Sequence, residues 1–485
     1  MSTAVAFAPA AASAGRLAWL RERGMGASIL VATISSAFGV ILIATTAYLG
    51  ALLRADPYIG ESGTLAFVLG FLTFLLVGVA VYVAGIVTAN TFSTVIVGRT
   101  RRIALLRLIG ATARSQRAEV ANQGLVVGAI GALLGLVLGT VLAGGGSAVA
   151  TNLLDPGDLD FALVQPSLLL PAVAVALTTW LAAWIGSRRV LTVTPLQALG
   201  GSVESSLRDV RRRAGRNTVA IVLFALGALL LAGGILLGLV TPLGVVVAFF
   251  GGILSFTGLA LGATLVMPPV LRLVGRAFGR GAMARLAAEN ADRYPERSSR
   301  MAIGVVMGVT LVTMFAVALE TVKSVLRAAA GGELPPEMTQ LLDTFAAVMM
   351  GLVAVSAVIA AVGLVNLLTI GIVQRRRELG LLRALGVSND QVRRMVLLEA
   401  AHLTIAATLA GLVLGIVYGW AGAQSLLGTV PVAADAPAAA TLVWPAVPLW
   451  PILAIVAGTA LLTLVAAVTP TRLATRVAPV EALAE

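Results

Sequence analysis

The sequence predicts an all-α integral membrane protein with about ten transmembrane helices, and composition, apolar run length and charge placement support this fold class. Hydrophobic residues make up 59% of the 485 residues and charged residues only 12%, whereas soluble domains have roughly 25% charged residues. The apolar runs contain roughly 20 or more residues, enough to cross a bilayer core of about 30 Å. Most charges lie between these runs. This composition excludes a soluble enzyme.

The apolar runs place the expected spans in order along the chain. They lie near residues 27–52, 63–97, 120–147, 165–187, 217–240, 242–273, 300–323, 341–374, 395–428 and 448–470. Several runs exceed about 25 residues, so these helices either tilt or continue beyond the bilayer. Residues 1–15 are Ala-rich and lack the basic and apolar regions of a signal peptide, so we expect a disordered cytoplasmic segment there.

Positive charge is distributed unevenly between the connecting segments. If the N-terminus is inside, 31 of the 34 Lys and Arg residues lie on the inner side, and only Arg54, Lys323 and Arg327 lie outside. Because cationic loops resist translocation, this asymmetry predicts a multi-pass protein of the cell membrane with both termini in the cytoplasm. Topology therefore accounts for the net charge of +12, and we expect no nucleic-acid partner.

An internal repeat is the most informative feature of the sequence. Residues 90–110 match residues 366–386 at a constant offset of 276, and the match continues without gaps into the following spans. Each copy contains four expected spans, so the copies have the same orientation, as in a parallel repeat. The predicted units are a lead, a first four-span repeat, a two-span linker and a second four-span repeat, at residues 1–15, 16–200, 201–284 and 285–485.

The most strongly charged part of the repeat is predicted to form a short amphipathic cytoplasmic helix in each copy. Leucine and isoleucine can form one face and arginine the other, and a glycine can cap the C-terminal end. The candidate residues are Arg99, Arg101, Arg102, Leu105, Leu106, Arg107 and Gly110, and then Arg375, Arg377, Glu378, Leu381, Leu382, Arg383 and Gly386. Two interpretations stay open here: an element that docks a partner protein, or a helix lying on anionic lipid.

This pattern resembles the FtsX-like permease family, the membrane subunits of type VII, MacB-like ABC transporters. The resemblance is carried by the sequence from Arg375 to Gly386, by Val392, Met395 and Glu399, by the span to Gly415, and by Pro479 to Leu483. The layout of four, two and four spans is similar to that of bacitracin-export-type permeases, although residues 321–341 are too short for their large extracellular domain. The first copy departs from the pattern, with Arg102 in place of Glu378.

The resemblance implies separate ATPase subunits, and two docking copies imply two of them. The chain has no G-x-x-x-x-G-K-[ST] loop, and Lys323, its only lysine, lies at a predicted outer edge. We therefore expect no catalytic residue and no bound cofactor, with ATP and Mg²⁺ held by the partner. Cysteine is absent and His402 is the only histidine, so we also expect no metal site.

Small residues and one acid are candidates for helix packing or for a path between the halves. The glycines form stripes that permit close helix contact, at Gly131, Gly135 and Gly139, and again at Gly411 and Gly415. The stripes could also meet at the axis between the halves, where a path would open. Glu399 is either a functional intramembrane acid or an interfacial acid bonded to Arg393, Arg394 or a neighbouring helix.

These observations favour the permease subunit of an ABC exporter that moves an amphiphilic or lipid-like substrate (an antibiotic, a peptide or a lipid) outward. The alternative is a signal transmitter that acts on an extracytoplasmic partner or a sensor kinase without transport. The short outer segments count against it. A secondary carrier is a third interpretation, which is disfavoured because no line of acids crosses the predicted bilayer.

Overall fold

The computed structural model describes nine stretches of the chain and a few single residues. These are residues 25–54, 105–106, 108–154, 161–188, 214–277, 286–287, 295–333, 383–430 and 441–476, with residues 70, 74, 78, 82, 289, 336, 339 and 381. All regular structure among them is helical. The expected span at 341–374 and most of the one at 63–97 lie outside the described residues.

The helices with assigned bounds follow the predicted order. They are α1 (Met25–Arg54), α4 (Ala113–Leu154), α5 (Leu169–Gly186), α7 (Ala214–Gly238), α8 (Gly244–Leu261), α9 (Ala263–Ala277), α11 (Pro295–Ala329), α14 (Asn389–Leu427) and α15 (Leu449–Arg476). By length and composition, seven helices of the described part can span a membrane: α1, α4, α5, α7, α8, α11 and α14. The all-α membrane fold is thereby confirmed, while the count of ten spans stays a prediction.

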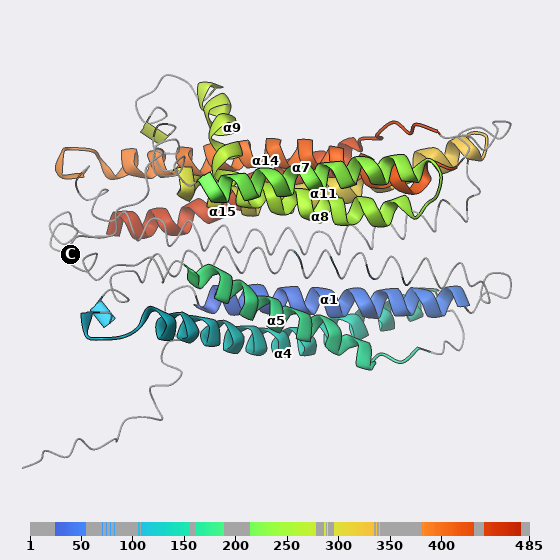
Figure 1. Ribbon diagram of the computed structural model, residues 1–485, viewed down its shortest axis with the longest axis horizontal. Helices are drawn as coiled ribbons and strands as arrows, with labels where there is room; N and C mark the ends of the chain where they lie inside the picture. Colours follow the sequence, from blue (N-terminus) through green and yellow to red (C-terminus); the bar gives the residue numbers. More distant parts are fainter. Residues whose placement is uncertain are drawn as a thin grey trace, which may run out of the picture.

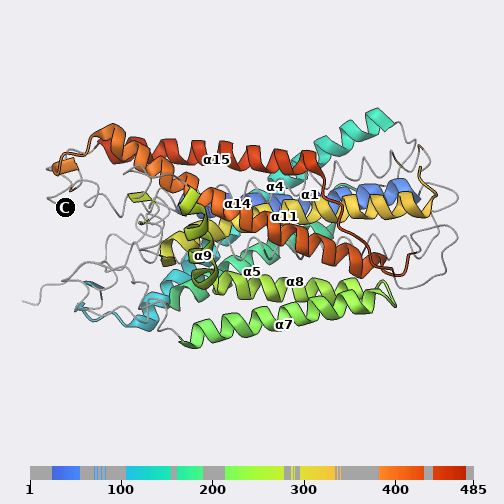
Figure 2. The same cartoon turned by 90° about the horizontal axis from the view of Figure 1, so that it is seen from above.

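The helices form two groups with nearly parallel axes. Figure 1 shows α1, α4 and α5 side by side in one group and α7, α8, α11, α14 and α15 in the other. In Figure 2 the second group is a layer, with α7 and α8 at one edge, α15 at the opposite edge, and α11 and α14 between them. The two groups correspond to the first predicted repeat and to the linker with the second repeat.

One buried apolar cluster joins the two groups. It includes Val31 of α1, Phe256 of α8, Leu271 of α9, Met307 of α11 and Leu403 of α14. Because Val31 belongs to the first group, α1 reaches the core of the second. The first group also keeps buried clusters of its own, one at Ala32 and Val175 and one around Val40 and Leu168.

Two helices are much longer than a bilayer is thick. α4 has 42 residues and α14 has 39, so each is about 60 Å long, roughly twice the hydrocarbon core. Both helices therefore continue beyond the bilayer, as expected for runs of this length. They occupy equivalent positions in the two predicted repeats.

The expected span at 242–273 is wrong beyond Leu261. α8 ends at Leu261, and a turn at Gly262 separates it from α9. Figure 1 shows α9 turned away from the direction of α8. The apolar run is therefore divided between a spanning helix and a separate short helix.

Close backbone contact holds α7 and α8 together as a hairpin. Gly234 of α7 lies against Ala248 of α8, so a Cβ added at Gly234 would come within 2.8 Å of the Ala248 Cα. A Cβ added at the neighbouring Gly233 would meet no atom within 4 Å. The two adjacent glycines are thus both helical, but only Gly234 is crowded by a neighbouring helix.

We predict that Gly234→Leu loosens the hairpin and that Gly233→Leu does not. Overpacking at Gly234 should cost about 1–3 kcal/mol, because the new side chain meets backbone that cannot move aside. The measurement is thermal unfolding of the detergent-purified protein, followed by tryptophan fluorescence. Equal midpoints for the two variants would contradict the hairpin contact.

Candidate functional site

Each copy of the repeated charged segment ends in a glycine that turns the chain. Gly110 has φ +103° and Gly386 has φ +97°, in the left-handed region where only glycine is unstrained. The Ala111 N–H donates to the Leu106 carbonyl oxygen at 2.9 Å, and the Gly386 N–H donates to that of Arg383 at 3.0 Å. A Schellman C-cap combines two bonds, and the described residues show one of them in the first copy and the other in the second. Each glycine therefore has the conformation that the predicted cap requires.

The helix after each turn begins with a hydroxyl cap. Thr112 Oγ1 accepts from the Ser115 N–H at 3.1 Å ahead of α4. Ser388 Oγ accepts from the Gln391 N–H at 3.3 Å ahead of α14, and Gln391 Oε1 accepts from the Ser388 N–H at 2.9 Å. The second arrangement is a capping box. Ser388 and Gln391 lie 276 positions after Thr112 and Ser115, so the repeat extends to these capping hydrogen bonds.

We call residues 105–115 and 381–391 the first and second turn elements. Both present apolar side chains at the end of the bundle. Ile109 is 81% exposed and Leu385 is 82% exposed, while Leu105 and Leu381 are about half exposed. Large apolar side chains that cluster on a surface beside charged residues mark an interaction site. The turn elements are therefore the strongest candidate for a partner-binding surface in the described part of the chain.

The structure describes only some of the predicted docking residues. Leu105, Leu106, Gly110, Leu381, Arg383 and Gly386 lie in the turn elements. The remaining candidates lie outside the described residues: Arg99, Arg101, Arg102, Arg107, Arg375, Arg377, Glu378 and Leu382. The role of their charges stays a prediction.

Glycines of α4 and α14 lie directly against the backbones of α1 and α11. A Cβ added at Gly139 would lie 2.8 Å from the Ala37 carbonyl oxygen, and one at Gly415 would lie 2.9 Å from that of Thr310. Gly131 lies on the same face of α4, against α1. Each predicted stripe thus packs on a helix of its own half, and within the described residues the two stripes do not face each other.

The same offset relates the contacts in the two halves. Gly135 of α4 lies against Thr33 of α1, and Gly411 of α14 lies against Val309 of α11. Both members of the second pair lie 276 positions after those of the first. The α1–α4 and α11–α14 pairs are therefore built alike.

Two ionisable side chains, one acid and one histidine, are among the buried residues of α14. Glu399 is 7% exposed and His402 is 1% exposed. The His402 Nε2 lies 2.7 Å from the Leu271 carbonyl oxygen, a hydrogen bond that ties α14 to α9. Gln123, which replaces Glu399 in the first copy, is also buried and donates from Nε2 to Glu119 Oε1 at 3.5 Å. The equivalent positions thus carry different polar groups in equally buried places.

One protein-family model matches this chain in two segments, and these segments include both turn elements. The model, described as FtsX-like permease C-terminal, matches residues 74–195 and 350–479, which together make up more than half of the chain. The chain belongs to the FtsX-like permease family. The long helices α4 and α14 lie wholly within the two matched segments of this permease.

Two curated proteins show local similarity to this FtsX-like permease. An uncharacterized ABC transporter permease of Methanocaldococcus jannaschii is 30% identical over 84 residues, which are 17% of this chain and 21% of that protein. The ABC transporter permease YtrF of Bacillus subtilis is 32% identical over 60 residues, or 12% and 14% of the two chains. Each match spans less than a quarter of the relative's length. No solved structure matches the chain significantly.

A cation–π contact joins the start of α4 to the end of α5 in this permease. The Arg117 guanidinium carbon lies 4.1 Å from the centroid of the Trp184 ring, and its Nη2 donates to the Trp184 carbonyl oxygen at 3.3 Å. Arg188 approaches the same ring at 5.6 Å. These contacts stiffen the region beside the first turn element. Sequence patterns gave no signal for them, since Arg117 and Trp184 are 67 positions apart.

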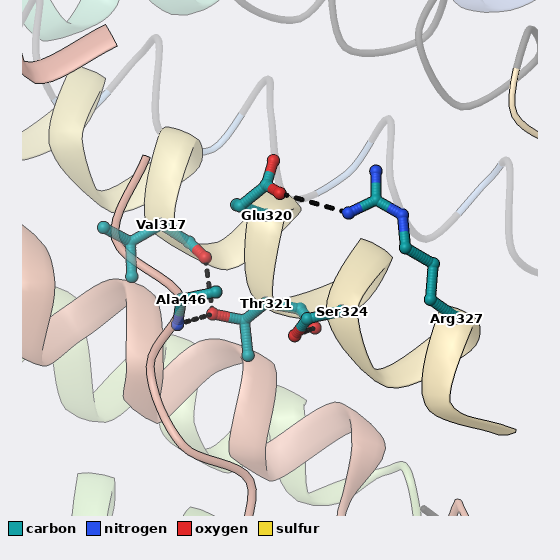
Figure 3. Close-up of polar contacts among 6 residues, drawn as sticks. All are labelled: Val317, Glu320, Thr321, Ser324, Arg327 and Ala446. Atoms are coloured by element: carbon teal, nitrogen blue, oxygen red, sulfur yellow. Dashed lines mark hydrogen bonds and ion pairs between the residues drawn. The ribbon is translucent and has the colours of Figure 1, made fainter. Parts of the chain in front are cut away.

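The opposite end of the permease is braced by α11. Figure 3 shows Thr321, whose Oγ1 donates to the Val317 carbonyl oxygen at 2.6 Å and accepts from the Ala446 N–H at 3.1 Å. Arg327 pairs with Glu320 at 3.5 Å on the surface, where an ion pair contributes about 0–1 kcal/mol. The ion pair lies within α11, so it is Thr321 that ties α11 to the segment that precedes α15.

α14 holds the same segment from its other side. The Gln424 side chain is fully buried; it accepts from the Val443 N–H at 2.6 Å and donates to the Thr441 carbonyl oxygen at 2.8 Å. Trp420 Nε1 donates to the Val443 carbonyl oxygen at 2.7 Å. The C-terminal part of the loop predicted at 429–447 is therefore fixed on two helices. We call residues 441–446 the braced segment.

We predict that Gly386→Ala loosens the second turn element without disturbing the spans. Alanine in the left-handed conformation costs about 1–2 kcal/mol, which corresponds to roughly 5- to 30-fold faster local opening. Hydrogen exchange of the amides near Gly386 and Ser388 measures this effect. Gly458→Ala in α15 is the control, because Gly458 has open space around it. Unchanged exchange near Gly386 would contradict the cap.

Proposed function

We propose that this chain is the permease subunit of an ABC exporter, and that two separate ATPase subunits dock on its two turn elements. Membership of the family implies an ATPase partner. The observation that carries the proposal is the equivalence of the turn elements, which share glycine caps, hydroxyl caps and exposed apolar residues at one offset. Two equivalent surfaces call for two equivalent partners. ATP and Mg²⁺ belong to those partners.

The direction of the chain in the membrane follows from the same elements. The turn elements and the arginine-rich starts of α4 and α14 lie at one end of the bundle, and the positive-inside rule assigns that end to the cytoplasm. The α7–α8 turn and the braced segment then lie at the extracytoplasmic end. Both chain termini are cytoplasmic in this orientation.

Coupling in the proposed exporter is mechanical. The capping box joins the second turn element rigidly to α14, and Gly411 and Gly415 join α14 closely to α11. A force on the turn element is therefore carried along a helix of about 60 Å to the far side of the membrane. Closure of the ATPases would tilt α4 and α14 together with their partner helices.

The substrate class we propose is amphiphilic or lipid-like. The spanning helices present apolar surface, and the buried cluster that joins the halves is apolar as well. An ion or a sugar would need polar groups along its path, because unpaired polar groups are costly in a bilayer. A substrate with a large apolar part needs no such polar groups along its path.

Docking is tested by placing a charge on the exposed apolar residues. We expect Leu385→Asp to weaken ATPase binding at least fivefold, and Ile109→Asp together with Leu385→Asp to abolish it. Val240→Asp is the matched control, because Val240 is 79% exposed at the opposite end of the bundle. The measurement is co-purification of an ATPase subunit, recognised by its Walker A sequence, from native membranes. Charge reversal at Arg377 and Arg383 tests the arginine face in the same assay.

The turn elements are not the docking sites if these variants retain the ATPase as well as the wild type and the Val240→Asp control do. Loss of binding in the control as well would show general misfolding. The spans of each variant are checked by its elution as a single species in detergent.

Export is tested with the permease and its ATPase in liposomes. We expect ATP-driven loss of a lipophilic fluorescent probe from the membrane, and no loss when an ATPase variant that cannot hydrolyse ATP is used. ATP hydrolysis without probe movement would favour the signal transmitter. Uptake that is sensitive to an ionophore and independent of ATP would favour a secondary carrier.

A further inference from the structure

A cavity lies where three parts of the chain meet. Its volume is about 240 Å³, and its walls come from α7 and α8 of the linker, from α11 and α14 of the second half, and from Tyr82 of the first half. Figures 1 and 2 show α7 and α8 lying beside α11 and α14. The cavity is distinct from both turn elements and faces the end of the bundle that carries the α7–α8 turn.

The described lining of the cavity is almost entirely apolar. Aromatic and methionine side chains make up seven of its nineteen described residues, among them Phe249, Phe256, Phe315, Met307 and Met314. Such side chains form a smooth, polarizable wall that suits an apolar group of variable shape.

The tyrosine hydroxyls at the cavity are already engaged by α8. Tyr82 Oη lies 2.9 Å from Thr257 Oγ1 and donates to the Ile253 carbonyl oxygen at 3.3 Å. Tyr418 Oη lies 2.9 Å from Ser255 Oγ. These bonds position both rings in the wall and leave their apolar faces toward the cavity.

Thr310 is the exception in this lining. It is 2% exposed, and its Oγ1 has no hydrogen-bond partner among the described residues. A buried water needs two to four polar partners, and a cation needs several oxygen ligands. One unengaged hydroxyl supplies neither, so the described walls favour a hydrocarbon occupant over water or an ion.

The volume of the cavity and the length of its lining narrow the class of possible occupants further. An apolar cavity of roughly 150 Å³ already binds benzene, and this one is larger. Its lining on α11 extends from Met307 to Val322, about 22 Å along the helix axis. A space lined over this length can take an extended hydrocarbon chain that lies along α11.

The cavity reaches the surface that faces the bilayer. Leu426 lines it and is 39% exposed. Two glycines, Gly252 and Gly422, also line it, and an added Cβ at Gly422 would meet no atom within 4 Å. An apolar chain can therefore enter sideways from the membrane without passing a polar barrier.

We propose that this cavity binds one hydrocarbon chain of a membrane amphiphile. The site does not require that the chain be exported, so it stands or falls separately from the proposed function. A bilayer phospholipid and a transported amphiphile share this chemistry. The experiment distinguishes these two sources.

The test uses the full-length protein in phospholipid nanodiscs with two photoreactive probes. One probe is a phospholipid with a diazirine on an acyl chain, and the other is a single-chain fatty acid with the same group. After illumination, labelled residues are mapped by peptide mass spectrometry. We expect labels on α11 and α14 residues of the cavity, at Met307, Met314 or Tyr418. If only the phospholipid probe labels the cavity, the occupant is a resident bilayer lipid. If the fatty-acid probe labels the cavity in the presence of excess phospholipid, the occupant is a single-chain amphiphile.

Three variants sharpen the result. Gly422→Leu fills the cavity and should reduce labelling of its residues at least fivefold, and it should fold because leucine favours a helix over glycine. Gly233→Leu is the matched control, since Gly233 is outside the cavity lining, has open space around it and should label as the wild type does. Thr310→Val should retain or increase labelling, because it removes a buried hydroxyl that has no hydrogen-bond partner among the described residues.

The proposal is overturned if neither probe labels the cavity, or if Gly422→Leu labels as strongly as Gly233→Leu. A loss of labelling in Thr310→Val would also overturn it, since the occupant would then depend on a polar contact. None of these readouts involves ATP, so failure of the docking or export experiments leaves this test unaffected.

Discussion

Backbone contact between α4 and α1, and between α14 and α11, is the interaction on which the rest of the structure depends. Inside a bilayer, burying leucine against leucine gains little, because lipid tails are equally apolar. Helices associate there through close van der Waals packing, which requires small residues. Gly139 and Gly415 supply it by bringing two backbones to a distance that a side chain would block. Each long helix thereby becomes one rigid body with its partner, rather than a rod sliding in lipid.

The same contacts explain why the cavity lies in one place. The α7–α8 hairpin packs on the second half, where Gly238 lies against Ser425 of α14. On α4, the positions 276 earlier than Tyr418 and Ser425 are Leu142 and Val149, both more than half exposed. The hairpin therefore covers one half of a repeated structure. A space bounded by linker and repeat forms where the hairpin crosses α11 and α14.

The features that could be predicted from the sequence are those that depend on composition and on local chemistry. The membrane fold and the glycine caps at Gly110 and Gly386 follow from residues close together in the chain, and the offset of 276 follows from comparing two such segments. Sequence reasoning did not reach the turn at Gly262, because hydropathy continues across it into α9. It also missed the His402–Leu271 bond and the Gln424 contacts with the braced segment. These depend on which helices become neighbours, and apolar spans alone do not specify their neighbours.

The repeat also shows where the two halves cannot respond alike. Trp420 and Gln424, which hold the braced segment, correspond at the offset of 276 to Gly144 and Ala148. Neither of those residues carries a side chain that can hydrogen-bond, so these two positions of α4 cannot form the equivalent contacts. Two equal forces on the turn elements would thus meet a stiffer opposite end of the bundle in the second half. In the proposed exporter, the larger movement at that end belongs to α4 and α1, while α11 and α14 hold the cavity wall in place.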